Sequence, residues 1–173
     1  EQERIILKDS ISPIPLHKSL VLLDEINRFK KNTFGDHLRL AFANALVYKI
    51  SNLRFGPEVG IGKAKEDVEV VGQWFGEVEK ICSDLESVRG NEYPKAEVFL
   101  TDSRDPAILL KSRQVSAVIT SPPYPNEKDY TRTTRLESVM LGFIADKHEL
   151  REMKKSMLRS NTRGVYKEDD DDK

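Results

Sequence analysis

The feature that most constrains this chain is an apolar run, Val115–Thr120, that leads directly into Ser121, Pro122, Pro123 and Tyr124. A short apolar run that ends in turn residues is typical of a buried β-strand. The two prolines fix φ and lack a backbone N–H, so the turn is stiff and its carbonyl oxygens stay free. We therefore expect a hydroxyl, a carbonyl and an aromatic ring together at the C-terminal end of a strand, where α/β sheets bind ligands. These groups suit a planar base that carries an exocyclic amine.

A second segment upstream extends the fold prediction. Ala96–Arg104 has the pattern of a strand that ends at an acid, Asp102, and Asp105-Pro106 is suited to begin a short helix, Ala107–Lys111. Strand, helix and strand in this order form a βαβ unit, in which the strands are parallel and the crossover is right-handed. The predicted fold class is α/β, with part of a Rossmann-like sheet preceded by a helical segment.

The order and spacing of residues 97–137, together with the tetrapeptide, resemble the amino-group DNA methyltransferases, whose catalytic motif is Ser-Pro-Pro-Tyr. The resemblance implies transfer of a methyl group from S-adenosylmethionine to the exocyclic amine of cytosine (N4) or adenine (N6) in DNA. Ser121 and the Pro122 carbonyl would accept hydrogen bonds from the amine, and Tyr124 would stack on the flipped base, with Pro123 completing the catalytic turn. Serine in the first position leans toward cytosine and leaves adenine open. The family also places an acidic loop one strand earlier, so Asp102 is a candidate to hold the base or the cofactor, with a helix cap as the alternative.

Polar residues after the tetrapeptide are candidates to contact the substrate. They are Asn126, Tyr130, Arg132 and Arg135. Arginine donates two hydrogen bonds at once to a phosphate, but these two arginines are equally suited to salt bridges with Asp129 and Glu137. A basic helix is expected at 147–159, after a helix at 134–145, and it is either a phosphate track or a solvated face.

The first half of the chain is predicted to be helical, in a segment at 1–92 that precedes a partial catalytic core at 93–165 and an acidic tail at 166–173. Apolar residues recur at helical spacing in Lys18–Lys31 and Asp36–Asn52. The clearest stripe is a third one, which comprises Val68, Val71, Phe75, Val78, Cys82 and Leu85. We expect all three stripes to form the core.

The glycine cluster Gly56–Lys63 does not follow an expected strand, so it is interpreted as a connector between helices. A methyltransferase needs a glycine-rich loop after a strand, where the backbone approaches the cofactor closely. The residues that bind S-adenosylmethionine therefore stay unknown, and we expect them in the remainder of a parent chain. On this interpretation the isolated chain is a fragment and is inactive or nearly so.

Composition sets looser limits. With 28 basic and 29 acidic residues the formal net charge is −1, so the net charge does not indicate a nucleic-acid partner. The single Cys82 excludes a disulfide framework and a cysteine zinc site, and its helix stripe predicts a core position. Three scattered histidines make a poor metal cluster, and no membrane span or signal peptide is visible, which favours the cytoplasm. The final Glu168–Lys173 is either a tag remnant or a native acidic stretch.

Two other functions remain open. The first is an RNA or other amine methyltransferase, which would differ in its preferred substrate. The second is a non-catalytic helical interaction domain, in which the tetrapeptide is an ordinary turn or an exposed polyproline-type ligand loop. This second alternative predicts that Tyr124 is accessible and that Val115–Thr120 is not a buried strand.

Overall fold

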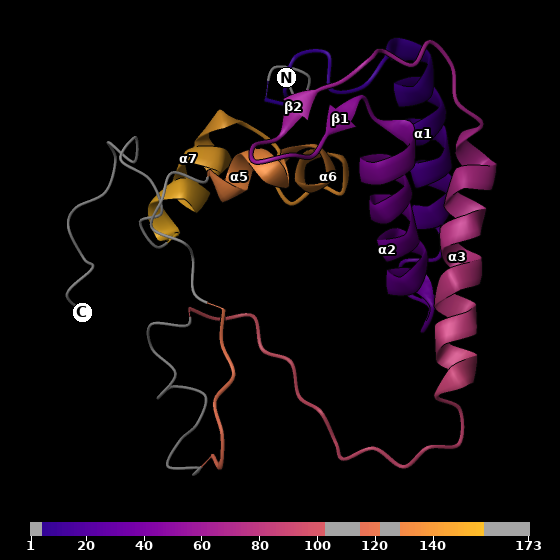
Figure 1. The fold of residues 1–173 in the computed structure, drawn as a ribbon, viewed down its shortest axis with the longest axis vertical. Coiled ribbons are helices and arrows are strands. Elements are labelled where there is room, and N and C mark those ends of the chain that lie inside the picture. The colour runs from indigo at the N-terminus through magenta and orange to yellow at the C-terminus, as the bar shows by residue number, and fades with distance from the viewer. Residues whose placement is uncertain (1–4, 103–114, 122–128, 158–173) are drawn as a thin grey trace.

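The computed structural model describes residues 5–102, 115–121 and 129–157 (Figure 1). The first half contains α1 (Pro13–Asn27), α2 (Gly35–Ala45), the π-helical turn η2 (Leu46–Ile50), the strands β1 (Leu53–Arg54) and β2 (Gly60–Ile61), and α3 (Val70–Ser87). The second half contains α5 (Tyr130–Thr133), α6 (Arg135–Met140) and α7 (Lys147–Ser156). Figure 1 shows α1, α2 and α3 side by side, with α6 next to the end of α2 that continues into η2. No helix in these described ranges is long and apolar enough to cross a membrane.

One core joins the two halves of the chain. Its buried residues are Ile11, Leu22, Leu23, Ile26, Phe42, Ala45, Leu46, Ile50, Val70 and Leu136. Leu136 comes from α6, whereas the others come from the first half of the chain. A smaller cluster repeats this pairing, because Ile5 packs with Val139 and Ile144. The segment after the tetrapeptide is thus built onto the N-terminal helices.

The predicted helices of the first half, and those after the tetrapeptide, are confirmed with shifted boundaries, whereas the predicted helix Ala107–Lys111 lies outside the described residues. The first begins at Pro13 and not at Lys18, because a proline at the first helical position removes an N–H that would have no partner there. Ser12 precedes the helix, but its hydroxyl accepts a hydrogen bond from Asn52 and does not cap α1. The second helix ends in the π-helical turn η2, which keeps Leu46, Val47 and Ile50 buried.

The predicted core face of α3 is confirmed only in part, because Val68 packs against the core and Val78 is half-buried. The other four residues of the stripe are exposed on the solvent side, and we call them the outer stripe: Val71, Phe75, Cys82 and Leu85. The helix packs through a neighbouring line of residues instead. Val70 is buried, and the indole of the half-buried Trp74 donates a hydrogen bond to the Leu38 carbonyl of α2, at 3.1 Å. The helix carries two apolar stripes, and α2 covers the less regular one.

The connector between α2 and α3 contains an antiparallel hairpin, which the sequence did not predict. Leu53 pairs with Ile61 and Arg54 with Gly60, so a strand does precede the glycine cluster. Asn52 holds the base of this hairpin. Its backbone N–H donates to Ser10 O at 2.7 Å, and its carbonyl accepts from Gly62 N at 2.7 Å.

Neither predicted strand of the βαβ unit is present in the described residues. Residues 96–102 and 115–121 are exposed and have no strand hydrogen bonds, and Leu100 and Ile119 are almost fully open to solvent. Figure 1 shows both segments as extended traces outside the helical body. The physical reason is that a parallel strand buries both faces under helices and pairs along its edges, and no described element lies over or beside these two runs.

Candidate functional site

Ser121 is the first residue of the tetrapeptide and ends an exposed extended segment. Pro122, Pro123, Tyr124 and Asn126 lie outside the described residues. The hydroxyl of Ser121 is therefore placed on a segment that projects from the helical body, where solvent and a ligand have access to it.

Asp102, the predicted acid of the preceding strand, ends the other extended segment and is also exposed. Both candidates thus belong to the part of the chain that leaves the shared core after α3 and returns to it at α5.

The chain that follows the tetrapeptide is anchored by a polar cluster around Asp129. The Asp129 carboxylate accepts hydrogen bonds from the Thr131 hydroxyl and from Lys154 Nζ, the latter at 2.8 Å. Partial burial alone would raise the pKa of Asp129, but the bonds from Lys154 and Thr131 outweigh burial, so this pKa is lowered. The cluster joins the start of α5 to α7, 25 residues later.

Arg135 extends this network toward the N-terminus. Its Nε donates to the Thr131 carbonyl at 2.9 Å, one Nη donates to the Thr131 hydroxyl at 3.0 Å, and the other donates to the Ile5 carbonyl at 3.3 Å. Burial lowers the pKa of Arg135, and the charge of Asp129 opposes this change. The guanidinium therefore ties α5, α6 and the N-terminal segment together, and its expected contact with a phosphate stays a prediction.

The two other described candidates lie on α5. Tyr130 is the first residue of the helix and is half-buried, whereas Arg132 is exposed. No described residue forms a hydrogen bond or ion pair with the Arg132 side chain. The expected contact of Arg132 with a phosphate stays a prediction.

The predicted salt bridges took a different form. The sequence suggested Arg132 and Arg135 as partners of Asp129 and Glu137. The structure pairs Asp129 with Lys154 instead, and no described residue forms an ion pair with Glu137. Lys154 and Thr131 are therefore structural residues that sequence reasoning missed. The sequence held one signal for Thr131, because Asp129 lies two residues before it at the start of a helix. No local pattern connected Lys154 to Asp129.

Glu137 is the least well accommodated carboxylate near this cluster. It is half-buried on α6, and its Oε2 has no hydrogen-bond partner among the described residues. Burial raises the pKa of Glu137, since it disfavours the charged form. Ionised Glu137 thus lowers the stability of the fold at neutral pH.

We predict that Glu137→Gln raises the free energy of unfolding at pH 7 by up to about 1 kcal/mol, after allowance for solvent screening. A group whose pKa is raised in the folded state contributes stability below its unfolded pKa, and this contribution is lost as the pH rises through its folded pKa. The gain in stability from Glu137→Gln should therefore vanish at pH values below the pKa of a free glutamate side chain. Urea unfolding at both pH values measures this difference. The exposed Glu66→Gln is the matched control, and an equal gain in both variants would contradict the prediction.

The glycine cluster lies in the hairpin. Gly56 and Gly60 occupy its turn and second strand, and a Cβ added at Gly60 would meet no atom within 4 Å, whereas one added at Gly62 would lie 3.3 Å from the Asn52 carbonyl oxygen. No contact with a cofactor is assigned to these residues, so the location of the residues that bind S-adenosylmethionine stays a prediction.

Similarity to a known protein covers about half of the chain. Over 94 residues, 54% of the chain, the sequence is 33% identical to the Type II methyltransferase M.BsoBI of Geobacillus stearothermophilus. The chain spans 15% of the length of that protein. No family model matches the chain, and no solved structure matches it. The similarity supports a relation to methyltransferases.

Proposed function

We propose that this chain is part of a DNA methyltransferase that transfers a methyl group from S-adenosylmethionine to the exocyclic amine of cytosine (N4) or adenine (N6). The observation that carries the proposal is the similarity of 94 residues to a Type II methyltransferase. The tetrapeptide Ser121–Tyr124 adds the chemistry, because it combines two hydrogen-bond acceptors with an aromatic ring. Since the chain spans a small part of its relative, the cofactor site is proposed to lie in the rest of a longer protein.

The chemistry of the base assigns roles to the tetrapeptide. An exocyclic amine is a poor nucleophile because its lone pair is delocalised into the ring. Ser121 Oγ and the Pro122 carbonyl accept hydrogen bonds from its two N–H groups and stabilise the positive charge that develops on the nitrogen. Tyr124 stacks on the base after it leaves the duplex. S-adenosylmethionine, when bound, supplies an electrophilic methyl group.

The anchored segment after the tetrapeptide supports this assignment. Asp129, Thr131, Lys154 and Arg135 fix the point at which the chain re-enters the core. A fixed return point helps to position the catalytic turn relative to a bound base, and positioning contributes much of the rate of such a transfer. Arg132, exposed on α5, is the residue proposed to contact the DNA backbone near this turn.

The exposed apolar surfaces support the Rossmann-like part of the proposal. Val98, Leu100, Val118 and Ile119 are each more than three-quarters exposed, and the outer stripe of α3 is also uncovered. A parallel strand needs a helix over its face, and an apolar helix stripe needs a partner. We propose that the two extended segments form adjacent parallel strands under α3 in the complete protein. Covering each large side chain would contribute roughly 1.5–3 kcal/mol.

A second candidate function rests on the same exposure. The interaction-domain alternative predicted that Val115–Thr120 is not a buried strand, and these residues are exposed. In that case the tetrapeptide is a ligand loop for an aromatic groove on a partner. The similarity to a methyltransferase favours the enzymatic function.

Methyl transfer by the natural protein that contains this chain tests the proposal. With labelled S-adenosylmethionine, we expect label in unmethylated DNA, and digestion to nucleosides identifies the base. We expect the 173-residue chain alone to give almost no transfer. Label only in RNA would move the function to an RNA methyltransferase, and no label in either nucleic acid would favour the ligand loop.

A further inference from the structure

Two aromatic rings lie exposed beside the hairpin. Tyr48 comes from η2 and Phe55 directly follows β1, and their ring centroids are 5.3 Å apart with an interplanar angle of 44°. Tyr48 is 66% exposed and Phe55 41%. The π-helical turn inserts an extra residue, so Tyr48 and Lys49 project outward while their neighbours stay in the core. Such turns occur frequently at functional sites.

Three cations accompany these rings. Lys49, Arg54 and Lys63 are exposed, and no described residue forms an ion pair or a side-chain hydrogen bond with any of them. Several other lysines of the described chain are engaged, as Lys18 is by Asp67 at 2.6 Å. We call Tyr48, Phe55, Lys49, Arg54 and Lys63 the hairpin patch.

The segment that carries this patch is locally basic, although the chain as a whole is not. Residues 48–66 contain four cations and two carboxylates, whereas the whole chain has a net charge of −1. The fourth cation, Lys65, is directed inward: its Nζ donates to the carbonyls of Lys49 and Ser51, both at 2.7 Å. It neutralises the negative end of the α2–η2 helix and leaves the other three free for a ligand.

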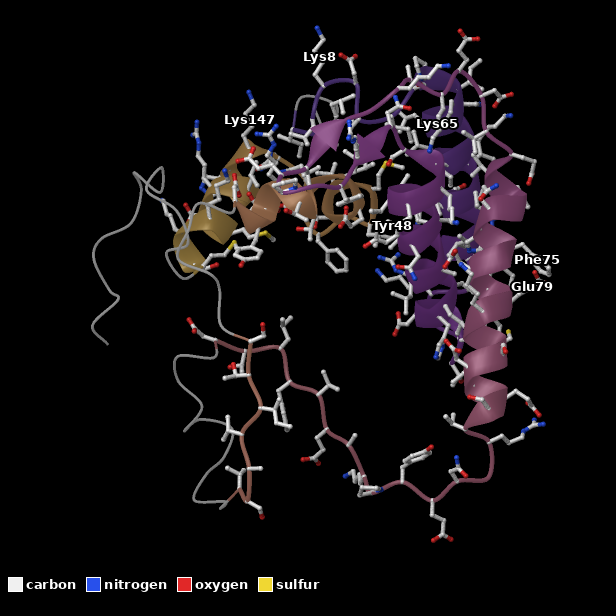
Figure 2. All side chains as sticks on the ribbon, viewed as in Figure 1. Lys8, Tyr48, Lys65, Phe75, Glu79 and Lys147 are labelled. Atoms are coloured by element: carbon white, nitrogen blue, oxygen red, sulfur yellow. The ribbon has the colours of Figure 1, made fainter. Side chains whose placement is uncertain are left out.

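Hydrogen bonds hold the base of the patch, which lies on the side of the molecule that carries the chain after the tetrapeptide. Asn52, buried at the base of the hairpin, accepts a hydrogen bond from Lys65 N at 2.9 Å, and Gly62 N donates to its carbonyl. The η2 turn packs against α6. Figure 2 shows Tyr48 on the side of α2 that faces α6.

We propose that the hairpin patch binds a single-stranded stretch of nucleic acid, with phosphates at the three cations and a base stacked on the aromatic pair. Bases stack on exposed aromatic side chains without regard to sequence, while a basic surface follows the backbone. An acidic protein segment would use the cations but has no group that needs the rings. The inference rests on the proposed function in one respect, which is that the nucleic acid is the DNA substrate. Base flipping by a DNA methyltransferase opens the duplex next to the target base.

The chain supplies a matched control for this proposal. Phe29 and Phe34 form a second exposed pair, with centroids 6.0 Å apart and an interplanar angle of 42°, next to the exposed Lys30 and Lys31. This pair lies at the α1–α2 connection, at the opposite end of α2 from η2. It has similar chemistry in a different place.

Fluorescence anisotropy with a labelled oligonucleotide tests the proposal on the 173-residue chain. We expect Lys49→Ala/Arg54→Ala/Lys63→Ala to weaken single-strand binding at least tenfold at low salt, and to reduce the slope of log K against log salt by about 2. Tyr48→Ala/Phe55→Ala should weaken binding about tenfold with an unchanged slope. Tyr48→Leu/Phe55→Leu repeats this test of the aromatic rings while it keeps apolar side chains of similar size. DNA and RNA strands are compared to identify the sugar.

Control variants at the α1–α2 connection show whether the loss of binding is specific to the hairpin patch. Phe29→Ala/Phe34→Ala and Arg28→Ala/Lys30→Ala/Lys31→Ala should leave the affinity within about twofold, because these exposed residues lie at the far end of α2 and salt screens their charges from the ligand. Equal losses in patch and control variants, no binding by the wild-type chain, or equal competition by an acidic polypeptide would each overturn the proposal. Binding is measured without methyl transfer, so its failure and the failure of the proposed function are observed separately.

Discussion

A Ser121→Ala variant of the natural protein that contains this chain is expected to transfer methyl groups about a hundredfold more slowly. The hydroxyl is proposed to accept one of the two amine N–H bonds, and that bond strengthens as positive charge develops on the nitrogen. Removing a single preorganised partner of a developing charge costs a factor of this order. Single-turnover transfer of labelled methyl to DNA measures the rate apart from product release.

Ser116→Ala provides the matched control for this prediction. Ser116 is exposed in the same extended segment and lies five residues before Ser121. We expect its variant to keep the wild-type rate, and DNA affinity to change little in both variants, because the Ser121 hydrogen bond is strongest in the transition state. A Ser121→Ala rate within about twofold of wild type would remove the hydroxyl from the mechanism.

Asn52→Ala is expected to lower the free energy of unfolding by about 3 kcal/mol. The Asn52 side chain is buried, and its amide donates to the Asp9 carbonyl at 3.0 Å and to the Ser12 hydroxyl at 3.1 Å. Its Oδ1 accepts from Lys65 N at 2.9 Å. Alanine leaves these groups without their partner, and an unpaired buried polar group costs roughly 1–3 kcal/mol.

Urea unfolding followed through the single tryptophan, Trp74, measures this loss. Asn32→Ala removes the same side chain from an exposed position and should change stability by less than about 0.5 kcal/mol. Asn52→Asp should be at least as destabilising as Asn52→Ala at pH 7, because it places a buried carboxylate against the Asp9 carbonyl oxygen, to which it cannot donate. Equal stabilities of the Asn52→Ala and Asn32→Ala variants would contradict the role given to Asn52.

Sequence periodicity predicted the helices because the information is local. Ala41, Phe42 and Ala45 recur at helical spacing and are buried, as expected. The hairpin escaped prediction because its strands are two residues long, too short to show an alternating pattern. The solvent side of α3 was assigned wrongly because its more regular stripe is not the one that α2 covers. Periodicity identifies apolar faces, and long-range packing decides which face is covered.

The candidate site divides in a similar way. The prediction of a stiff turn at Ser121–Tyr124 rests on proline geometry alone and needs no tertiary information. The pairing of Asp129 with Lys154 connects residues 25 positions apart, and the contact of Arg135 with Ile5 connects residues 130 apart. No local pattern predicts such contacts, so the anchoring network became visible only in the structure.

The shared core has a consequence for how this protein can vary. Because Leu136 packs among the N-terminal helices, and Val139 packs with Ile5, the chain leaves the core after α3 and returns to it at α5. Loop-closure entropy changes slowly with loop length, so segments of different length between these two points cost the helices little stability. The helical body can therefore keep its structure while the segment between α3 and α5 differs in length or sequence.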